Sequence, residues 1–231
     1  MKIYGLNKTT LLDYPGLVAA TLFTGSCNFR CPFCHNGDLV LTPQVFPEIS
    51  TEEIFSFLKK RKGILSGVCI TGGEPTLQRD LPDFIVKIRE LGYLIKLDTN
   101  GYRPDILHVL MEHRLLDYVA MDIKASPANY HIACGIPSPD LHLIEESAAL
   151  LIKGSIPYEF RTTVVKGIHT EEDFLEIRRW LAGSSPYFLQ SYKESDGVIS
   201  KKYSAFTKEE LEHFQTVLNV TMPNVSIRGV E

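Results

Sequence analysis

The chain has 231 residues, a formal net charge of -4, and 44% hydrophobic and 23% charged residues. These values exclude a disordered, collagen-like or low-complexity chain, and no apolar run nears the roughly 20 residues of a membrane span. The slight acidity gives no electrostatic reason to expect nucleic acid or a membrane as a partner. Since no export signal is evident at the N-terminus, we expect a soluble protein of the cytoplasm.

Apolar strand-like segments alternate with amphipathic helical segments along the whole chain. We predict strands over 17–24, 68–71, 94–97, 118–123, 158–165, 187–191 and 225–227. Hydroxyl caps, first-turn acids and C-terminal glycines predict the helices. One helix starts near residue 50, and five more cover residues 81–91, 105–113, 141–153, 170–182 and 207–218.

The predicted elements form roughly six βα units in sequence. Such repeats indicate a parallel sheet, because each helical crossover returns the chain to the same direction. Six units are too few for a complete eight-stranded barrel. We therefore expect an α/β fold in one domain over residues 1–231, as a partial (βα)6 TIM-like barrel or, alternatively, an open doubly wound sheet. In both, the carboxyl ends of the strands carry the site, and the polar and glycine-rich motifs fall there, which favours an enzyme.

A cysteine-rich loop follows the first predicted strand. Cys27, Cys31 and Cys34 have the spacing C-x-x-x-C-x-x-C, and the odd total of five cysteines argues against a disulfide framework. Thiolates suit zinc, copper or iron–sulfur clusters. A structural zinc ion takes four ligands, and His35, adjacent to Cys34, is poorly placed to be the fourth. Three thiolates can instead hold three corners of a [4Fe–4S] cluster, leaving one iron open for chemistry.

The loop, with Phe33 just before its last cysteine, resembles the motif of radical S-adenosylmethionine (SAM) enzymes. This resemblance implies a partial barrel of the radical SAM type, in which Cys27, Cys31 and Cys34 bind a [4Fe–4S] cluster. It also implies that SAM chelates the open iron and that Phe33 packs near the adenine. Cys69 and Cys134 stand apart from the loop. We expect Cys69 to be a core residue and Cys134 to be structural.

A Thr-Gly-Gly-Glu-Pro segment follows the second predicted strand, at residues 71–75. Two glycines and a proline are typical of a turn, but glycines also let the main chain approach a ligand closely. In radical SAM enzymes this segment binds the amino group of the cofactor. The resemblance therefore implies that Gly72, Gly73 and Glu74 contact SAM.

Two further strand ends resemble those of the glycyl-radical-enzyme activating enzymes, a group that includes pyruvate formate-lyase activating enzyme. Asp98 and Thr99 lie in a D-x-N-G sequence that is also a common turn, and Asp122 and Lys124 have the spacing of a same-face pair on a strand, typical of a surface ion pair. By resemblance, Asp98, Thr99 and Lys124 contact SAM. A monovalent cation near Asp98, Thr99 and Asp122 is also implied, since carboxylates and hydroxyls suit hard ions.

Two more candidates lie on the last predicted strands. Arg161 stands in an apolar strand and needs a partner, because an unpaired buried charge is costly. The partner is either an anionic ligand or carboxylate inside the barrel, or a salt bridge at the strand end. The family has an arginine here in its active site. The family also has a histidine near the end of the next strand that we cannot place in this sequence, and Gln190 is our candidate for its role.

The Asp-Tyr-Pro-Gly sequence at residues 13–16 is a turn by its composition. It resembles the opening of the anaerobic ribonucleoside-triphosphate reductase activating proteins. The implied function is that of an oxidoreductase active in the absence of oxygen. It cleaves SAM reductively to a 5′-deoxyadenosyl radical, which takes a hydrogen atom from a glycine of a glycyl radical enzyme. The implied partners are that enzyme, namely anaerobic ribonucleotide reductase, and an electron donor of the flavodoxin or ferredoxin type.

Three alternatives stay open at this stage. The first is a radical SAM enzyme that acts on a small molecule or nucleotide in cofactor biosynthesis. The second is a zinc-stabilised binding module without catalysis. The third is an electron carrier, although such a protein usually saturates its cluster with four cysteines.

Overall fold

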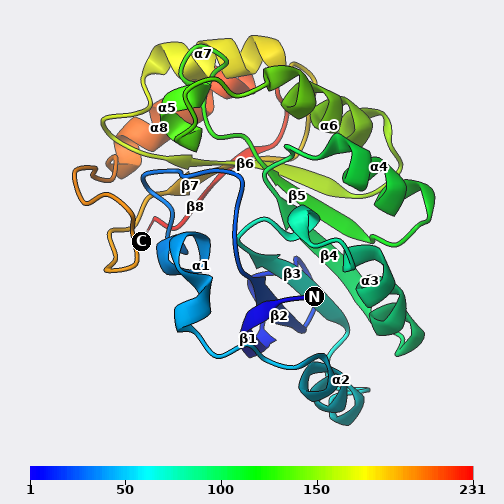
Figure 1. Ribbon diagram of the computed structural model, residues 1–231. Coiled ribbons are helices and arrows are strands. Elements are labelled where there is room, and N and C mark those ends of the chain that lie inside the picture. Colours follow the sequence, from blue (N-terminus) through cyan, green and yellow to red (C-terminus); the bar gives the residue numbers. More distant parts are fainter. Residues whose placement is uncertain (231) are drawn as a thin grey trace.

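The computed structural model describes residues 1–230 and contains one mixed sheet of eight strands in chain order (Figure 1). The strands are β1 (Ile3–Thr10), β2 (Ala19–Thr24), β3 (Gly67–Gly72), β4 (Leu94–Thr99), β5 (Tyr118–Asp122), β6 (Tyr158–Val164), β7 (Tyr187–Ser191) and β8 (Val225–Arg228). Strand β1 is antiparallel to β2, and every later neighbouring pair is parallel.

The longer helices cover the outer face of this curved sheet (Figure 1). The helices are α1 (Gly37–Leu41), α2 (Thr51–Lys60), α3 (Leu81–Glu90), α4 (Pro104–Glu112), α5 (Tyr130–Cys134), α6 (Leu141–Lys153), α7 (Glu171–Trp180) and α8 (Lys208–Asn219). The expected caps form: Ser50 accepts from the Glu53 N–H, and Thr207 accepts from the Glu210 N–H. These hydroxyls satisfy amide groups that the first helical turn leaves unpaired.

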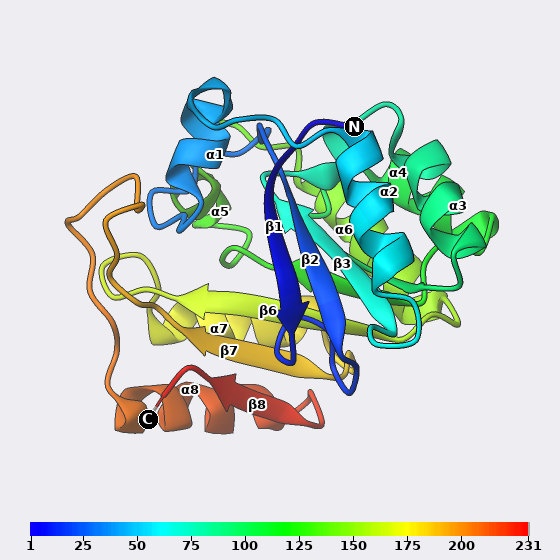
Figure 2. The ribbon, with the colours of Figure 1, turned by 90° about the horizontal axis from the view of Figure 1, so that it is seen from below.

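The sheet is a partial barrel, as predicted. Strand β1 pairs with β2 at one edge and β8 pairs with β7 at the other, and no pairing joins β1 to β8 within residues 1–230. Figure 2 shows both edge strands and the open side of the barrel. The six predicted βα units are β2 to β7 with their crossovers, and β8 is the predicted closing strand.

The prediction missed β1 and the short helices α1 and α5. The Asp-Tyr-Pro-Gly turn therefore does not precede the first strand; it lies between β1 and β2. Tyr14 of this turn is buried and packs against Gly67 at the start of β3. Because β3 runs from Gly67 towards Gly72, this turn lies at the opposite end of the barrel from the cysteine loop.

The parallel register brings the carboxyl ends of successive strands together. Asp122 of β5 pairs in register with Arg161 of β6, and Thr163 of β6 pairs with Gln190 of β7. Cys69 and Cys134 are fully buried core residues, as expected. Among residues 1–230, no helix is both long and apolar enough to cross a membrane.

Candidate active site

One pocket at the carboxyl ends of the strands brings the predicted site residues together. Its empty space is about 880 Å³ with the open mouth included. Every predicted metal or cofactor residue lines it: Cys27, Cys31, Phe33, Cys34, Gly72, Gly73, Glu74, Asp98, Thr99, Lys124, Arg161 and Gln190. The pocket is also lined by residues that the prediction assigned to no cluster or SAM contact, among them Asn36, Asn100 and Thr163.

The cysteine loop is fixed by contacts with two distant segments. The Arg30 N–H donates to the Cys134 carbonyl of α5 at 2.8 Å, and the Ser200 N–H donates to the Pro32 carbonyl at 2.8 Å. Gly135, at the end of α5, has a φ of 70°, and a Cβ there would meet the Arg30 carbonyl oxygen at 2.1 Å. Only glycine allows this approach. The end of α5 and the segment around Ser200 therefore fix the position of the cysteine loop.

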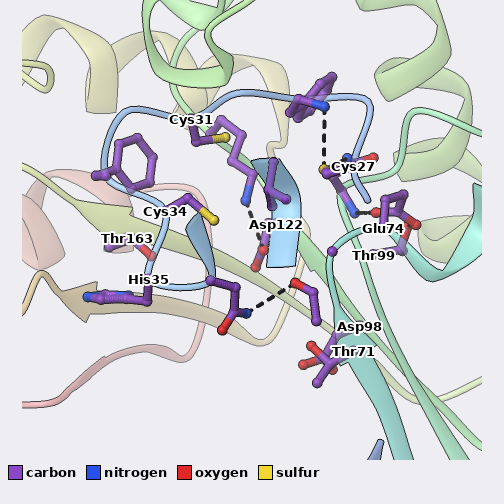
Figure 3. Close-up of a pocket in the computed structure, with 18 of the residues that line it drawn as sticks. Cys27, Cys31, Cys34, His35, Thr71, Glu74, Asp98, Thr99, Asp122 and Thr163 are labelled. Atoms are coloured by element: carbon purple, nitrogen blue, oxygen red, sulfur yellow. Dashed lines mark hydrogen bonds and ion pairs between the residues drawn. The ribbon is translucent and has the colours of Figure 1, made fainter. Parts of the chain in front are cut away.

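The three thiols line one side of the pocket, and Cys27 is the one near Glu74 and Thr99 (Figure 3). Burial, with the Glu74 carboxylate nearby, raises the pKa of Cys27 to about 11. Burial likewise raises the pKa of Cys31 to about 12 and that of Cys34 in the same direction. Such thiols need a metal to stabilise their thiolate form.

The donor set fits a cluster. Within residues 1–230, no three Cys, His, Asp or Glu side chains lie close enough together to hold a single metal ion. A cluster does not require this, because each thiolate binds a different iron. Three thiols in one pocket are the soft ligands that iron–sulfur clusters take.

Both glycines of the Gly-Gly-Glu-Pro segment allow close contact with the start of the cysteine loop. A Cβ on Gly73 would meet the Ser26 carbonyl oxygen at 1.9 Å, and one on Gly72 would meet Thr24 backbone atoms at 2.5 Å. The Gly73 N–H donates to the Thr24 carbonyl and the Glu74 N–H to that of Ser26, both at 2.8 Å. Close packing against Thr24 and Ser26 thus requires glycine at both positions, apart from any contact of these residues with SAM.

Glu74 is almost fully buried and bonds to uncharged donors. Its Oε1 accepts from the Thr76 hydroxyl at 2.6 Å and from the Thr99 hydroxyl at 2.8 Å, and its Oε2 accepts from the Asn100 N–H at 2.7 Å. Burial raises the pKa of Glu74, and these hydrogen bonds counteract only part of the rise. The carboxylate therefore joins the turn after β4 to the segment after β3.

Charged groups from β4, β5 and β6 pair on the other side of the pocket. Arg161 Nε donates to Asp122 Oδ1 at 2.9 Å, and Arg161 Nη1 donates to Asp98 Oδ2 at 3.2 Å. Lys124 donates to Asp122 at 2.9 Å, and Lys96 pairs with Asp98. The partners of Arg161 are therefore carboxylates inside the barrel, the first of the two alternatives, and not a salt bridge at the strand end. Lys124 and Asp122 form a partly buried pair in the pocket, whereas their spacing alone is typical of a surface pair.

These pairs determine the charge states of both carboxyl groups. Burial alone would raise the pKa of Asp122, but Arg161 and Lys124 outweigh it and lower the pKa to about 2. Burial also opposes the charged form of Asp98, and Arg161 and Lys96 lower its pKa nevertheless. Because side-chain cations already contact these carboxylates, the structure gives no support to the monovalent cation predicted beside them.

Phe33 packs against a histidine that the prediction did not include. The rings of Phe33 and His169 meet edge to face with centroids 6.4 Å apart. His169 Nδ1 accepts from the Val165 N–H at 3.0 Å, and its Nε2 lies 2.8 Å from the Lys124 carbonyl oxygen, to which it donates. Burial lowers the pKa of His169, which keeps it neutral. The sequence around His169 contains no motif that would have indicated these contacts.

His35 contacts the segment after β7. Its Nε2 lies 2.7 Å from the Lys193 carbonyl oxygen, and its ring stacks on Tyr192 with centroids 5.7 Å apart. The side chain is exposed and forms no hydrogen bond with a cysteine sulfur among the described residues. His35 is therefore an exposed loop residue in this structure.

With this geometry established, the comparisons with known proteins identify the family. The model of the radical SAM superfamily matches residues 21–181, and the chain belongs to this superfamily. A Methanocaldococcus jannaschii protein, named as a glycyl-radical enzyme activating enzyme, is 30% identical over 99% of this chain and 96% of its own length. A Saccharolobus solfataricus protein named as a GTP 3′,8-cyclase is 28% identical over 84% of this chain, but the match spans only 63% of that protein.

Solved structures share the fold. Streptococcus suis SuiB has a TM-score of 0.67 at 16% identity, with 91% of this chain and 49% of SuiB covered. A domain of pyruvate-formate lyase-activating enzyme from Bacteroides vulgatus has a TM-score of 0.57 at 20% identity, with 71% of this chain and 99% of that domain covered. At these identities the likeness concerns the fold alone.

Proposed function

We propose that this chain is a glycyl-radical-enzyme activating enzyme, an oxidoreductase that works as a single radical SAM domain. It would cleave SAM reductively, and the resulting 5′-deoxyadenosyl radical would take a hydrogen atom from a glycine of a partner glycyl radical enzyme. The observation that carries the proposal is the match to the activating-enzyme relative, which covers 99% of this chain and 96% of that protein.

In this proposal Cys27, Cys31 and Cys34 hold a [4Fe–4S] cluster, which when bound supplies the electron for SAM cleavage. The three thiols line the same pocket, and their loop is fixed through Cys134 and Ser200. A preformed loop reduces the ordering needed when the cluster binds.

We assign SAM to the remainder of this pocket. Phe33, held against His169, would cover the adenine, and the Gly72–Glu74 segment would meet the amino group. Arg161, Lys124 and Gln190 would face the carboxylate, and Asp98 and Thr99 would meet the remaining polar groups. Arg161 and Lys124 are already charged and oriented by Asp122, so they need little reorganisation to bind an anion.

A second hollow beside the pocket supports a macromolecular substrate. It is lined by Tyr4, Gly5, Phe23, Asp38, Leu39, Phe46, and by His35 and Asn36, which also line the main pocket. Leu41 and Val45 nearby are 49% and 67% exposed. A partly apolar groove that shares lining residues with the reaction pocket would suit a polypeptide whose glycine enters the site.

The second candidate is a radical SAM enzyme for a nucleotide, which the matches to GTP cyclases favour. Those matches leave over a third of each cyclase uncovered, and we therefore rank this candidate second. Anaerobic ribonucleotide reductase as the partner, a flavodoxin or ferredoxin as the electron donor, and a cytoplasmic location stay predictions.

The first test is production of 5′-deoxyadenosine by the anaerobically reconstituted, chemically reduced protein. We expect about four irons per chain and SAM cleavage in the wild type. Cys31→Ala should lose cleavage altogether, whereas Cys69→Ala, which removes a thiol outside the pocket, should keep its irons. Full cleavage by Cys31→Ala, or about one zinc per chain in place of iron, would contradict the proposal.

The second test identifies the hydrogen donor. An anaerobic ribonucleotide reductase labelled with deuterated glycine should transfer deuterium into 5′-deoxyadenosine, and unlabelled GTP should not raise product formation. Cleavage that GTP stimulates, without deuterium transfer from the reductase, would favour the nucleotide enzyme.

A further inference from the structure

Asn100 lies in the turn after β4 with its side chain oriented by the backbone. The residue is 5% exposed, and its Oδ1 accepts from the Tyr102 N–H at 3.0 Å. A backbone N–H can only donate, so this contact assigns the amide oxygen without ambiguity. The Nδ2 group must therefore face the opposite direction, towards the cysteine loop.

Both hydrogens of this Nδ2 group have acceptors on the cysteine loop. Nδ2 lies 2.8 Å from Asn28 Oδ1 and 3.7 Å from Cys27 Sγ. The Phe29 N–H also donates to Cys27 Sγ, at 3.3 Å. Among residues 1–230, Asn100 is the one side-chain amide that donates to any of the three cluster cysteines.

Glu74 holds Asn100 in this position. The Asn100 N–H donates to Glu74 Oε2 at 2.7 Å, and the neighbouring Thr99 hydroxyl donates to Glu74 Oε1 at 2.8 Å. Glu74 is buried and is itself fixed by Thr76. A continuous set of hydrogen bonds thus runs from the Gly-Gly-Glu-Pro segment through Asn100 to the sulfur of Cys27.

We propose that Asn100 is a positioning residue whose amide tunes the reduction of the cluster through the Cys27 sulfur. Reduction adds negative charge to the cluster and its thiolates, and a hydrogen bond to sulfur stabilises that charge. Asn100 therefore makes the cluster easier to reduce, and Glu74 fixes the donor before the electron arrives. This inference rests on the cluster assigned under the proposed function.

The experiment is a redox titration of the reconstituted holoprotein without SAM, followed by electron paramagnetic resonance. Asn100→Ser removes the amide that reaches sulfur and keeps a hydroxyl near the Tyr102 N–H. We expect its midpoint potential to fall so that, at a fixed potential, the ratio of reduced to oxidised cluster drops about tenfold, which is about 59 mV for one electron. Asn100→Asp has the size of asparagine and keeps the acceptor for Tyr102, and its potential should fall further because it adds negative charge.

Asn36→Ser is the matched control. Asn36 lines the same pocket, but its Nδ2 donates to the Gly72 carbonyl at 3.1 Å and to no sulfur. The same amide-to-hydroxyl change there should leave the midpoint potential unchanged.

The outcomes separate this inference from the proposed function. A wild type that lacks about four irons contradicts both. If the wild type carries the irons, the proposed function stands. If either Asn100 variant then also carries its cluster and titrates at the wild-type potential, the inference alone is contradicted. An equal shift in Asn36→Ser would also contradict it, because the effect would then not depend on contact with sulfur.

Discussion

Two sides of the pocket hold carboxylates in opposite electrostatic settings. On the β3–β4 side, Glu74 bonds to uncharged donors from Thr76, Thr99 and Asn100, and burial raises its pKa. On the β5–β6 side, Asp122 bonds to Arg161 and its pKa is lowered to about 2 although burial opposes this. Desolvation opposes the charged form of both groups, so the partner decides the sign of the shift.

The difference suggests a division of labour within one pocket. A carboxylate among amides and hydroxyls fixes backbone turns, and in this chain those turns carry the predicted SAM segment and the donor to Cys27. A carboxylate between cations instead fixes the direction of the cations, which remain charged for an anionic ligand group. The following predictions test this comparison, beginning with the largest expected effect.

Arg161→Met should be the most damaging of these changes. It removes the cation shared by Asp98 and Asp122 and leaves two partly buried carboxylates close together with fewer partners. Loss of one member of a buried ion-pair network costs about 3 kcal/mol, which in a chain of this size lowers Tm by roughly 6–12 °C. Thermal unfolding of the reconstituted proteins measures the loss.

Arg161→Lys is the control for charge without the planar fork. It should recover part of the stability lost in Arg161→Met, because one ammonium cannot bond to both carboxylates in the same geometry. A wild-type Tm in Arg161→Met would show that the pairs contribute nothing, and the comparison of the two sides would fail.

Acid pH should act on the two sides with opposite sign. The pKa of Asp122 is lower in the folded chain than in the unfolded one, so its stabilisation is complete above about pH 4 and is lost as pH falls towards 2. The pKa of Glu74 is raised, so the folded chain binds the extra proton above about pH 4 and the contribution of Glu74 falls as pH rises.

The measurement is urea unfolding of the cluster-free, reduced chain between pH 2 and pH 7. The stability difference between wild type and Asp122→Asn should grow from pH 2 to pH 4. The difference between wild type and Glu74→Gln should shrink above pH 4. Slopes of the same sign for both variants would mean that the partners do not set the pKa shifts as described.

The sequence predicts the parts of this molecule that depend on local pattern. Alternating apolar strands and capped helices located β2 to β8, and the motifs at their carboxyl ends indicated where the pocket would lie. Strand β1 escaped prediction because Asn7, Lys8 and Thr9 are exposed on an edge strand. Its pairing with β2 spans the connection 11–18, which is longer than the two- to five-residue loops of ordinary hairpins.

The contacts across the pocket could not be predicted in the same way. Arg161 meets Asp98 and Asp122 because three strands lie in a particular register, and a sequence pattern does not contain that register. The amide of Asn100 reaches Cys27 across 73 positions of the chain. The D-x-N-G sequence predicts a turn there, and only the fold places the turn beside a sulfur.

The smallest expected effect comes from an ion pair outside the pocket. Arg103 and Asp105 form two hydrogen bonds at 2.8 and 2.6 Å, a geometry as good as that of Arg161. Their side chains are 38% and 60% exposed, however, against 12% for Arg161 and 14% for Asp98. Water screens exposed pairs, which contribute about 0–1 kcal/mol.

Arg103→Gln should therefore change the unfolding free energy by about 0.5 kcal/mol or less, and added salt should reduce the change further. The same urea experiment at pH 7 measures it beside Arg161→Met. A loss in Arg103→Gln as large as that in Arg161→Met would mean that hydrogen-bond geometry, and not burial, gives the pocket ion pairs their strength. A small loss would mean that the pocket ion pairs are strong because water is excluded from them. Exclusion of water is also the condition under which the amide beside Cys27 can influence a cluster.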